Sequence, residues 1–243
     1  MKQLAFFLLL LLVACSVPKT FRKFSPEEKS AIKKYTKLIN TKDGRYHVLI
    51  TTSMGDMVVK LYNETPLHRD NFVSKVKSGF YDSLLFHRVI NNFMIQGGDP
   101  DSKRAKSDAA LGDGNAAGAN IPAEFRTEQN IYHKRGVLAA ARDNNPEKSS
   151  SNCQFYIVQR KVWRPSQLDS TIIKRKLTLN ETQKKLYTTV GGTPHLDGGY
   201  TVYGELEIGF EVLDKIAATK TGKADRPEQD VRMKMFLLNE VKK

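Results

Sequence analysis

Four side chains within one short segment have the types needed to act on a peptide bond. Residues 86–99 contain a cation, Arg88, two large apolar residues, Phe93 and Met94, and an amide, Gln96. Rotation about a proline peptide bond is slow because the C–N bond is partly double, which gives a barrier of about 18–20 kcal/mol. Lowering that barrier requires an apolar slot for the ring and a donor for the nitrogen of the twisted amide. Arg88 is the expected donor, because a guanidinium is planar and stays charged.

Short strands are the elements that must position these side chains. Residues 86–95 predict two strands joined by an Asn-Asn turn. Alternating or continuous apolar residues predict further strands at residues 46–50, 57–62, 136–141, 154–159, 201–206 and 231–238. Helices are predicted where Thr65-Pro66 caps a segment ending at Gly79, and at residues 210–217. Many short strands with two or three helices favour a β-barrel or sandwich.

Three regions lie outside this pattern. Residues 25–39 predict an N-terminal helix, because Ser25 is a cap, Pro26 follows it and Glu28 completes a capping box. Residues 161–193 are polar and basic with loosely helical apolar spacing, which predicts a helical insertion on the surface. Residues 100–120 are rich in Gly, Ala and Asp and predict a long loop.

Residues 86–99 resemble the signature of the cyclophilin-type peptidyl-prolyl isomerases, and four more segments agree with that family in order. They are Thr65-Pro66 with Asn71-Phe72, residues 121–125, residues 136–141 with 154–157, and residues 195–204. The resemblance covers about residues 46–241, and we assign a domain to residues 46–243 with the insertion at about 161–193. It implies a mainly β fold, a closed eight-stranded antiparallel barrel capped by two helices.

The same resemblance implies the site residues. It assigns catalysis to Arg88 and Gln96, with Gln96 either holding the arginine or contacting the substrate carbonyl. It assigns substrate binding to Phe93, Met94, Ala141, Arg142, Gln154, Tyr156, His195, Leu196 and Tyr200. The Arg142 side chain is expected to be incidental, because the family binds peptide there through its backbone. Tyr200 replaces a histidine of many members, and His195 replaces a tryptophan of vertebrate-type members, which argues against tight cyclosporin binding.

Three residues could suggest other chemistry. His87 lies between apolar neighbours and is expected to be structural. Cys153 lies in an apolar strand-like run and is expected to be a small buried hydrophobe, since a catalytic thiol needs a base. His195 lacks the partner spacing of a zinc site. We therefore expect neither a metal nor a cofactor.

The N-terminus resembles a bacterial lipoprotein signal. Lys2 precedes a short apolar run at residues 4–13, which is too short to span a bilayer. Leu12-Val13-Ala14-Cys15 resembles a lipobox, so we predict a signal peptide over 1–14, lipidation at Cys15, and a tether with a short helix over 15–45. The alternative is an ordinary signal peptide with a coincidental cysteine. Ser16 is not acidic, which favours the outer membrane, facing the periplasm, over inner-membrane retention.

Charge excludes one class of partner. The 243 residues carry a net charge of +13, but Lys and Arg are spread along the chain without the clustering that nucleic-acid binding needs. We expect a monomer, whose partners are proline-containing peptides, unfolded exported proteins, and a membrane through Cys15. The leading hypothesis is an isomerase that assists the folding of exported proteins. The alternatives are a chaperone-like binding module without catalysis, and an envelope assembly protein with residues 161–193 as its partner site.

Overall fold

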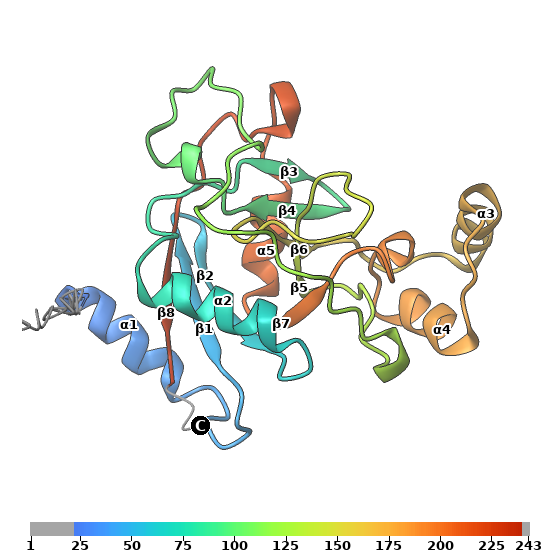
Figure 1. The fold of residues 1–243 in the computed structure, drawn as a ribbon, viewed down its shortest axis with the longest axis horizontal. Helices are drawn as coiled ribbons and strands as arrows, with labels where there is room; N and C mark the ends of the chain where they lie inside the picture. Colours follow the sequence, from blue (N-terminus) through green and yellow to red (C-terminus); the bar gives the residue numbers. More distant parts are fainter. Residues whose placement is uncertain (1–21, 240–243) are drawn as a thin grey trace, which may run out of the picture.

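The computed structural model describes residues 22–239, so the predicted signal peptide and Cys15 lie outside the described residues. Figure 1 shows a β-sheet at the centre with helices around it. The strands are β1 (His47–Thr52), β2 (Gly55–Leu61), β3 (Arg88–Ile90), β4 (Met94–Gly97), β5 (Val137–Ala140), β6 (Phe155–Val158), β7 (Val202–Ile208) and β8 (Met233–Leu237). Among residues 22–239, no helix is both long and apolar enough to cross a membrane.

The eight strands form one antiparallel sheet in the order β3-β4-β6-β5-β7-β2-β1-β8. β3 and β8 are edges, so the sheet is a curled, open half-barrel and the prediction of a closed barrel is wrong. The reason is local, because β3 has three residues and the chain before it is irregular. That irregular segment meets β8 through isolated backbone bonds, such as Ser83 N to Met233 O at 2.8 Å and Phe86 N to Val231 O at 3.0 Å.

Two helices cover the main core, as predicted. The α-helices are α1 (Pro26–Thr36), α2 (Pro66–Lys77), α3 (Pro165–Arg175), α4 (Glu181–Thr189) and α5 (Phe210–Ala217), and the short 3-10 helices are η1 (Pro100–Arg104), η2 (Thr127–Gln129), η3 (Pro194–Leu196) and η4 (Lys223–Asp225). Phe72 and Val76 of α2, and Leu213 and Ile216 of α5, are buried with the inward-facing strand residues. Burial of such apolar side chains is the main stabilising contribution to the fold.

The start of α2 differs from the prediction. Thr65 is the N-cap residue, but its side chain makes no capping hydrogen bond. The carboxylate of Glu124 accepts hydrogen bonds instead from the backbone N–H groups of Leu67 and His68, at 3.1 and 3.0 Å. The unpaired N–H groups of a first helical turn favour a negative charge, and Glu124 supplies it from a distant segment.

The N-terminal helix α1 forms with the predicted capping box. Ser25 Oγ accepts from Glu28 N at 3.3 Å, and Glu28 Oε2 accepts from Ser25 N at 2.9 Å. Tyr35 of α1 is buried with Leu49 and Phe236, so this helix packs against the sheet.

The insertion consists of α3 and α4, at the opposite end of the long axis from α1 (Figure 1). Its apolar residues form a small core with the body of the protein, in which Trp163, Leu168 and Tyr187 pack with Tyr132. Tyr187 also donates a hydrogen bond to Asp197 Oδ2 at 2.6 Å. The insertion is helical, as predicted, and it is fastened to the segment that follows it.

Candidate active site

Strand alternation places the predicted site residues on one face of the sheet. Ile95 of β4 belongs to the main core, so its neighbours Met94 and Gln96 project to the other side. Gln96 pairs with Arg88 on β3 and with Tyr156 on β6. The three adjacent strands therefore bring a cation, an amide and an aromatic ring together.

A cavity of about 180 Å³ opens on this face. The described residues that line it are Arg88, Phe93, Met94, Gln96, Ala141, Arg142, Tyr156, Leu196 and Tyr200. All of them were predicted from the sequence as site residues. Two predicted residues lie beside this cavity: Gln154 lines a neighbouring cavity of about 360 Å³, and His195 stacks on Phe93 with ring centroids 5.9 Å apart.

The floor of the 180 Å³ cavity is apolar. Met94 and Tyr156 are 2% and 5% exposed, and they pack in a second hydrophobic cluster with Ala141. The Tyr156 hydroxyl is hydrogen-bonded to Nε2 of His133 at 3.0 Å. Burial raises the pKa of Tyr156 well above its usual value, so the ring stays neutral. Such a floor suits a proline ring and offers no group for proton transfer.

Arg88 is one of two arginines that line the cavity, with Arg142, and its side chain is 43% exposed. Its Nε donates a hydrogen bond to Asp225 Oδ2 at 3.3 Å, so Asp225 orients the guanidinium. Gln96 lies beside Arg88, as predicted, but its Nε2 donates to Gln154 Oε1 at 3.1 Å. This bond engages one of the two N–H groups of the Gln96 amide, and both roles predicted for Gln96 stay predictions.

Asp225 was missed from the sequence, and no local signal could have found it. It lies 137 residues from Arg88, in the short helix η4. Ala224 and Asp225 both have left-handed backbone angles, with φ of 57° and 59°. Non-glycine residues seldom adopt this conformation, so the local sequence does not predict where the carboxylate points.

The Arg142 side chain makes contacts within the protein that were not predicted from the sequence, while its expected incidental role in peptide binding stays a prediction. Its Nε donates to the carbonyl oxygen of Gly199 at 2.9 Å, and its Cζ lies 4.6 Å from the ring centroid of Tyr200. Arg142 therefore holds the segment that forms one wall of the cavity.

Asp197 holds the same wall from its other side. Its Oδ1 accepts from His133 N at 2.8 Å, and its Oδ2 accepts from Tyr187 and from Gln183 Nε2 at 2.6 and 2.8 Å. Since Gln183 and Tyr187 belong to α4, the insertion is coupled through one buried carboxylate to the wall that contains Leu196.

The two residues expected to be structural are buried. Burial lowers the pKa of His87 to about 4, so its imidazole is neutral near pH 7. Burial also raises the pKa of the Cys153 thiol, which disfavours the nucleophilic thiolate.

Comparison with solved structures bears on the fold. A cyclophilin-type peptidyl-prolyl cis-trans isomerase of Cryptosporidium parvum is similar, with a TM-score of 0.59 and 24% sequence identity, covering 79% of this chain and 97% of that one. A second structure of that isomerase, in the presence of the dipeptide Ala-Pro, gives a TM-score of 0.57 at 24% identity, covering 78% and 96% of the two chains. At this identity, the likeness concerns the fold.

Comparison of sequences bears on the family. The profile described as "Cyclophilin type peptidyl-prolyl cis-trans isomerase/CLD" matches residues 47–236. A Staphylococcus haemolyticus protein named for peptidyl-prolyl cis-trans isomerase activity is 37% identical over 191 residues, covering 78% of this chain and 89% of the relative. A Staphylococcus aureus protein with the same designation is 36% identical over 192 residues, covering 77% and 89%. With a matching profile, related sequences and a matching fold around the Arg88 cavity, the chain belongs to the cyclophilin-type peptidyl-prolyl cis-trans isomerases.

Proposed function

We propose that Arg88 is the catalytic donor of this isomerase and that its natural substrates are X-Pro bonds in proteins exported across a bacterial membrane. The observation that carries the catalytic assignment is that Arg88 lines a cavity of about 180 Å³ together with the apolar Met94 and the buried Tyr156. The cavity combines the ring slot and the donor that the reaction requires.

The mechanism follows from the electronic change during rotation. In the planar amide the nitrogen lone pair is delocalised, whereas in the twisted amide it is localised and accepts a hydrogen bond. A guanidinium held by Asp225 donates to that nitrogen only in the twisted state, so it lowers the barrier without tightening ground-state binding equally. Phe93, Met94 and Tyr156 hold the ring, and Gln96 holds the carbonyl of the residue before it.

The test is the isomerisation rate of a short X-Pro peptide with the full-length protein in detergent. We expect Arg88→Ala to lower kcat/KM by a factor of ten or more, the scale seen when a transition-state donor is removed. Arg104→Ala is the matched control, because Arg104 is exposed and is not among the residues that line the cavity. Wild-type activity in Arg88→Ala would refute the donor role. Affinity without acceleration in the wild type would favour a binding module.

The proposed location rests on the residues before the described part of the chain. The Leu12-Val13-Ala14-Cys15 segment supports a signal peptide over 1–14 and acylation of Cys15, with attachment to the outer membrane facing the periplasm. In that compartment the available X-Pro substrates are exported chains that are still folding.

The location can be tested by fractionation and mass spectrometry of the N-terminal peptide. We expect the wild type to occur in the membrane fraction with an acylated N-terminal cysteine. We expect Cys15→Ser to lack the acyl group and to be either unprocessed or soluble. An unmodified wild-type N-terminus would contradict the lipoprotein assignment and leave the isomerase assignment intact.

A further inference from the structure

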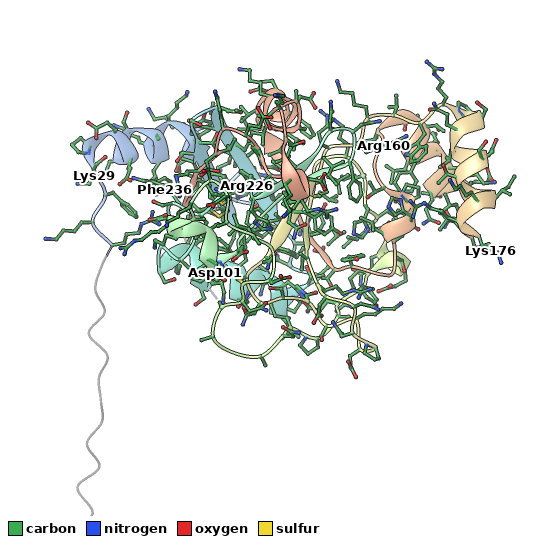
Figure 2. The ribbon with its side chains drawn as sticks, turned by 90° about the horizontal axis from the view of Figure 1, so that it is seen from above. Lys29, Asp101, Arg160, Lys176, Arg226 and Phe236 are labelled. Atoms are coloured by element: carbon green, nitrogen blue, oxygen red, sulfur yellow. The ribbon has the colours of Figure 1, made fainter. Side chains whose placement is uncertain are left out.

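A second cavity adjoins the isomerase cavity, where the insertion meets the body of the protein. It has a volume of about 480 Å³, and Phe93 lines both cavities. The described residues that line it are Asn92, Phe93, Arg160, Trp163, Thr171, Lys174, Arg175, Thr193 and His195. Figure 2 shows Arg160 at the point where the chain leaves the body of the protein towards α3 and α4.

The lining of this second cavity is cationic. Arg160, Lys174 and Arg175 contribute three positive charges, and none of the described residues that line the cavity is acidic. Within residues 22–239, no salt bridge is recorded for these three cations, unlike Lys161 or Arg135 nearby, which both pair with Asp214. Charges gathered without a counter-ion repel one another, so the site favours an anion.

Unsatisfied polar atoms gather at the same place. Arg160 Nε, Thr193 Oγ1 and His195 Nδ1 are all buried without a hydrogen-bond partner, and their residues all line this cavity. Thr193 is only 1% exposed. Buried polar groups in folded proteins nearly always have partners. Three unpaired polar groups thus belong to residues of one cavity wall, and together with the cations they make that wall polar.

Arg160 is positioned to bind a planar anion. Its Cζ lies 3.6 Å from the ring centroid of Trp163, so the stacking fixes the plane of the guanidinium. The Trp163 indole is itself anchored, because Nε1 donates to the carbonyl oxygen of Gly192 at 2.8 Å. A guanidinium held in one plane can donate two parallel hydrogen bonds to a carboxylate, which makes arginine selective for such groups.

We propose that this second cavity is a specificity subsite for an Asp or Glu side chain of the client polypeptide, a few residues from the proline bound beside Arg88. The proposal rests on the proposed isomerase function. The shared wall at Phe93 places the carboxylate within reach of the same extended peptide. Because Lys174 and Arg175 lie in the last turn of α3, the subsite gives the insertion a role in substrate choice.

The experiment compares pairs of X-Pro peptides that carry Glu or Gln at each of three positions on either side of the proline. For the full-length wild type in detergent, we expect Glu to raise kcat/KM about tenfold at one or two positions, as a charge-assisted hydrogen bond would. Lys174→Gln with Arg175→Gln should remove most of that preference, and so should Arg160→Gln. Lys185→Gln is the matched control, because it removes an exposed charge of α4 that does not line the cavity.

The outcomes separate the subsite from the isomerase function. Equal kcat/KM for Glu and Gln peptides at every position, with turnover intact, overturns the subsite and leaves the isomerase assignment standing. If no peptide is isomerised, the proposed function fails. The dissociation constants of the same peptide pairs, measured by fluorescence anisotropy, then test the subsite, which predicts tighter binding of the Glu peptide. Inhibition by inorganic phosphate without any preference for Glu peptides would assign the cations to a free anion and overturn the proposal.

Discussion

Arg88 depends for its orientation on a carboxylate that is itself about half exposed. The side chains of Arg88 and Asp225 are 43% and 45% exposed, so water screens their attraction and the pair contributes little to folding stability. The ion pair matters for geometry, because it holds the guanidinium of Arg88, which has many rotamers, in one direction. Asp225 is therefore a positioning residue.

Replacement of Asp225 by Asn is expected to lower kcat several-fold, with little change in KM. The substitution removes the charge that holds Arg88 but leaves the apolar cavity that binds the proline ring. Separate measurement of kcat and KM tests this, with Asp108→Asn, an exposed acid in the long loop, as the control. An unchanged kcat in Asp225→Asn would show that Arg88 needs no support.

His87 makes the fold sensitive to acid. Its folded-state pKa of about 4 lies below the usual 6.5, because burial disfavours the imidazolium. Between these two values the unfolded chain binds more protons than the folded one, so stability falls as the pH is lowered through this window. The loss approaches roughly 3 kcal/mol below pH 4.

We expect His87→Leu to reduce the loss of stability between pH 7 and pH 4.5, since neither ring nitrogen of His87 has a partner to lose. Urea unfolding at the two pH values measures it. His87→Leu should remove only part of this loss of stability, because burial also lowers the pKa of His195 to about 4. An identical pH dependence in wild type and His87→Leu would contradict the assignment.

At the scale of elements, α4 acts on the cavity through a single carboxylate. Asp197 follows Leu196, and α4 supplies two of its hydrogen-bond donors. The helix thus fixes a wall that it does not itself form. This coupling joins the insertion, which differs in character from the rest of the chain, to the part of the domain that binds substrate.

Tyr187→Phe is expected to lower the free energy of unfolding by about 1–3 kcal/mol and to raise KM, because a buried bond to a carboxylate is lost. Urea unfolding and peptide kinetics measure the two effects. Tyr35→Phe is the control, since Tyr35 lies on α1 at the other end of the molecule. A rise in KM in Tyr35→Phe of the same size would show that the effect is global.

Some of these elements could be predicted from the sequence, because the residues that determine them are close together in the chain. The capping box at Ser25 and the Asn-Asn turn between β3 and β4 each lie within a few residues. The contacts that decide the site do not, because Glu124 reaches α2 and Asp225 reaches Arg88 from distant segments. The open sheet also escaped prediction, since strand pairing at the edges depends on backbone geometry rather than on side-chain pattern.

At the scale of the whole molecule, the insertion is part of the domain. Deletion of residues 161–193 would expose Tyr132 and leave Asp197 without Tyr187 and Gln183. We therefore expect the deletion to lower both the thermal midpoint and kcat/KM. Full isomerase activity in the deleted protein would instead favour the hypothesis that the insertion serves only an assembly partner.

The positions of α1 and the insertion at opposite ends of the long axis (Figure 1) also have a consequence for substrate encounter. If Cys15 is acylated, the lipid is attached on the α1 side of the described residues, and the cationic cavity beside α3 lies at the far end of the long axis. An anionic lipid surface then competes little with a client carboxylate for those charges, since attraction to headgroups fades within about 10 Å at physiological salt. The enzyme would sample polypeptides arriving from the aqueous side, and its selectivity would be the same on the membrane as in solution.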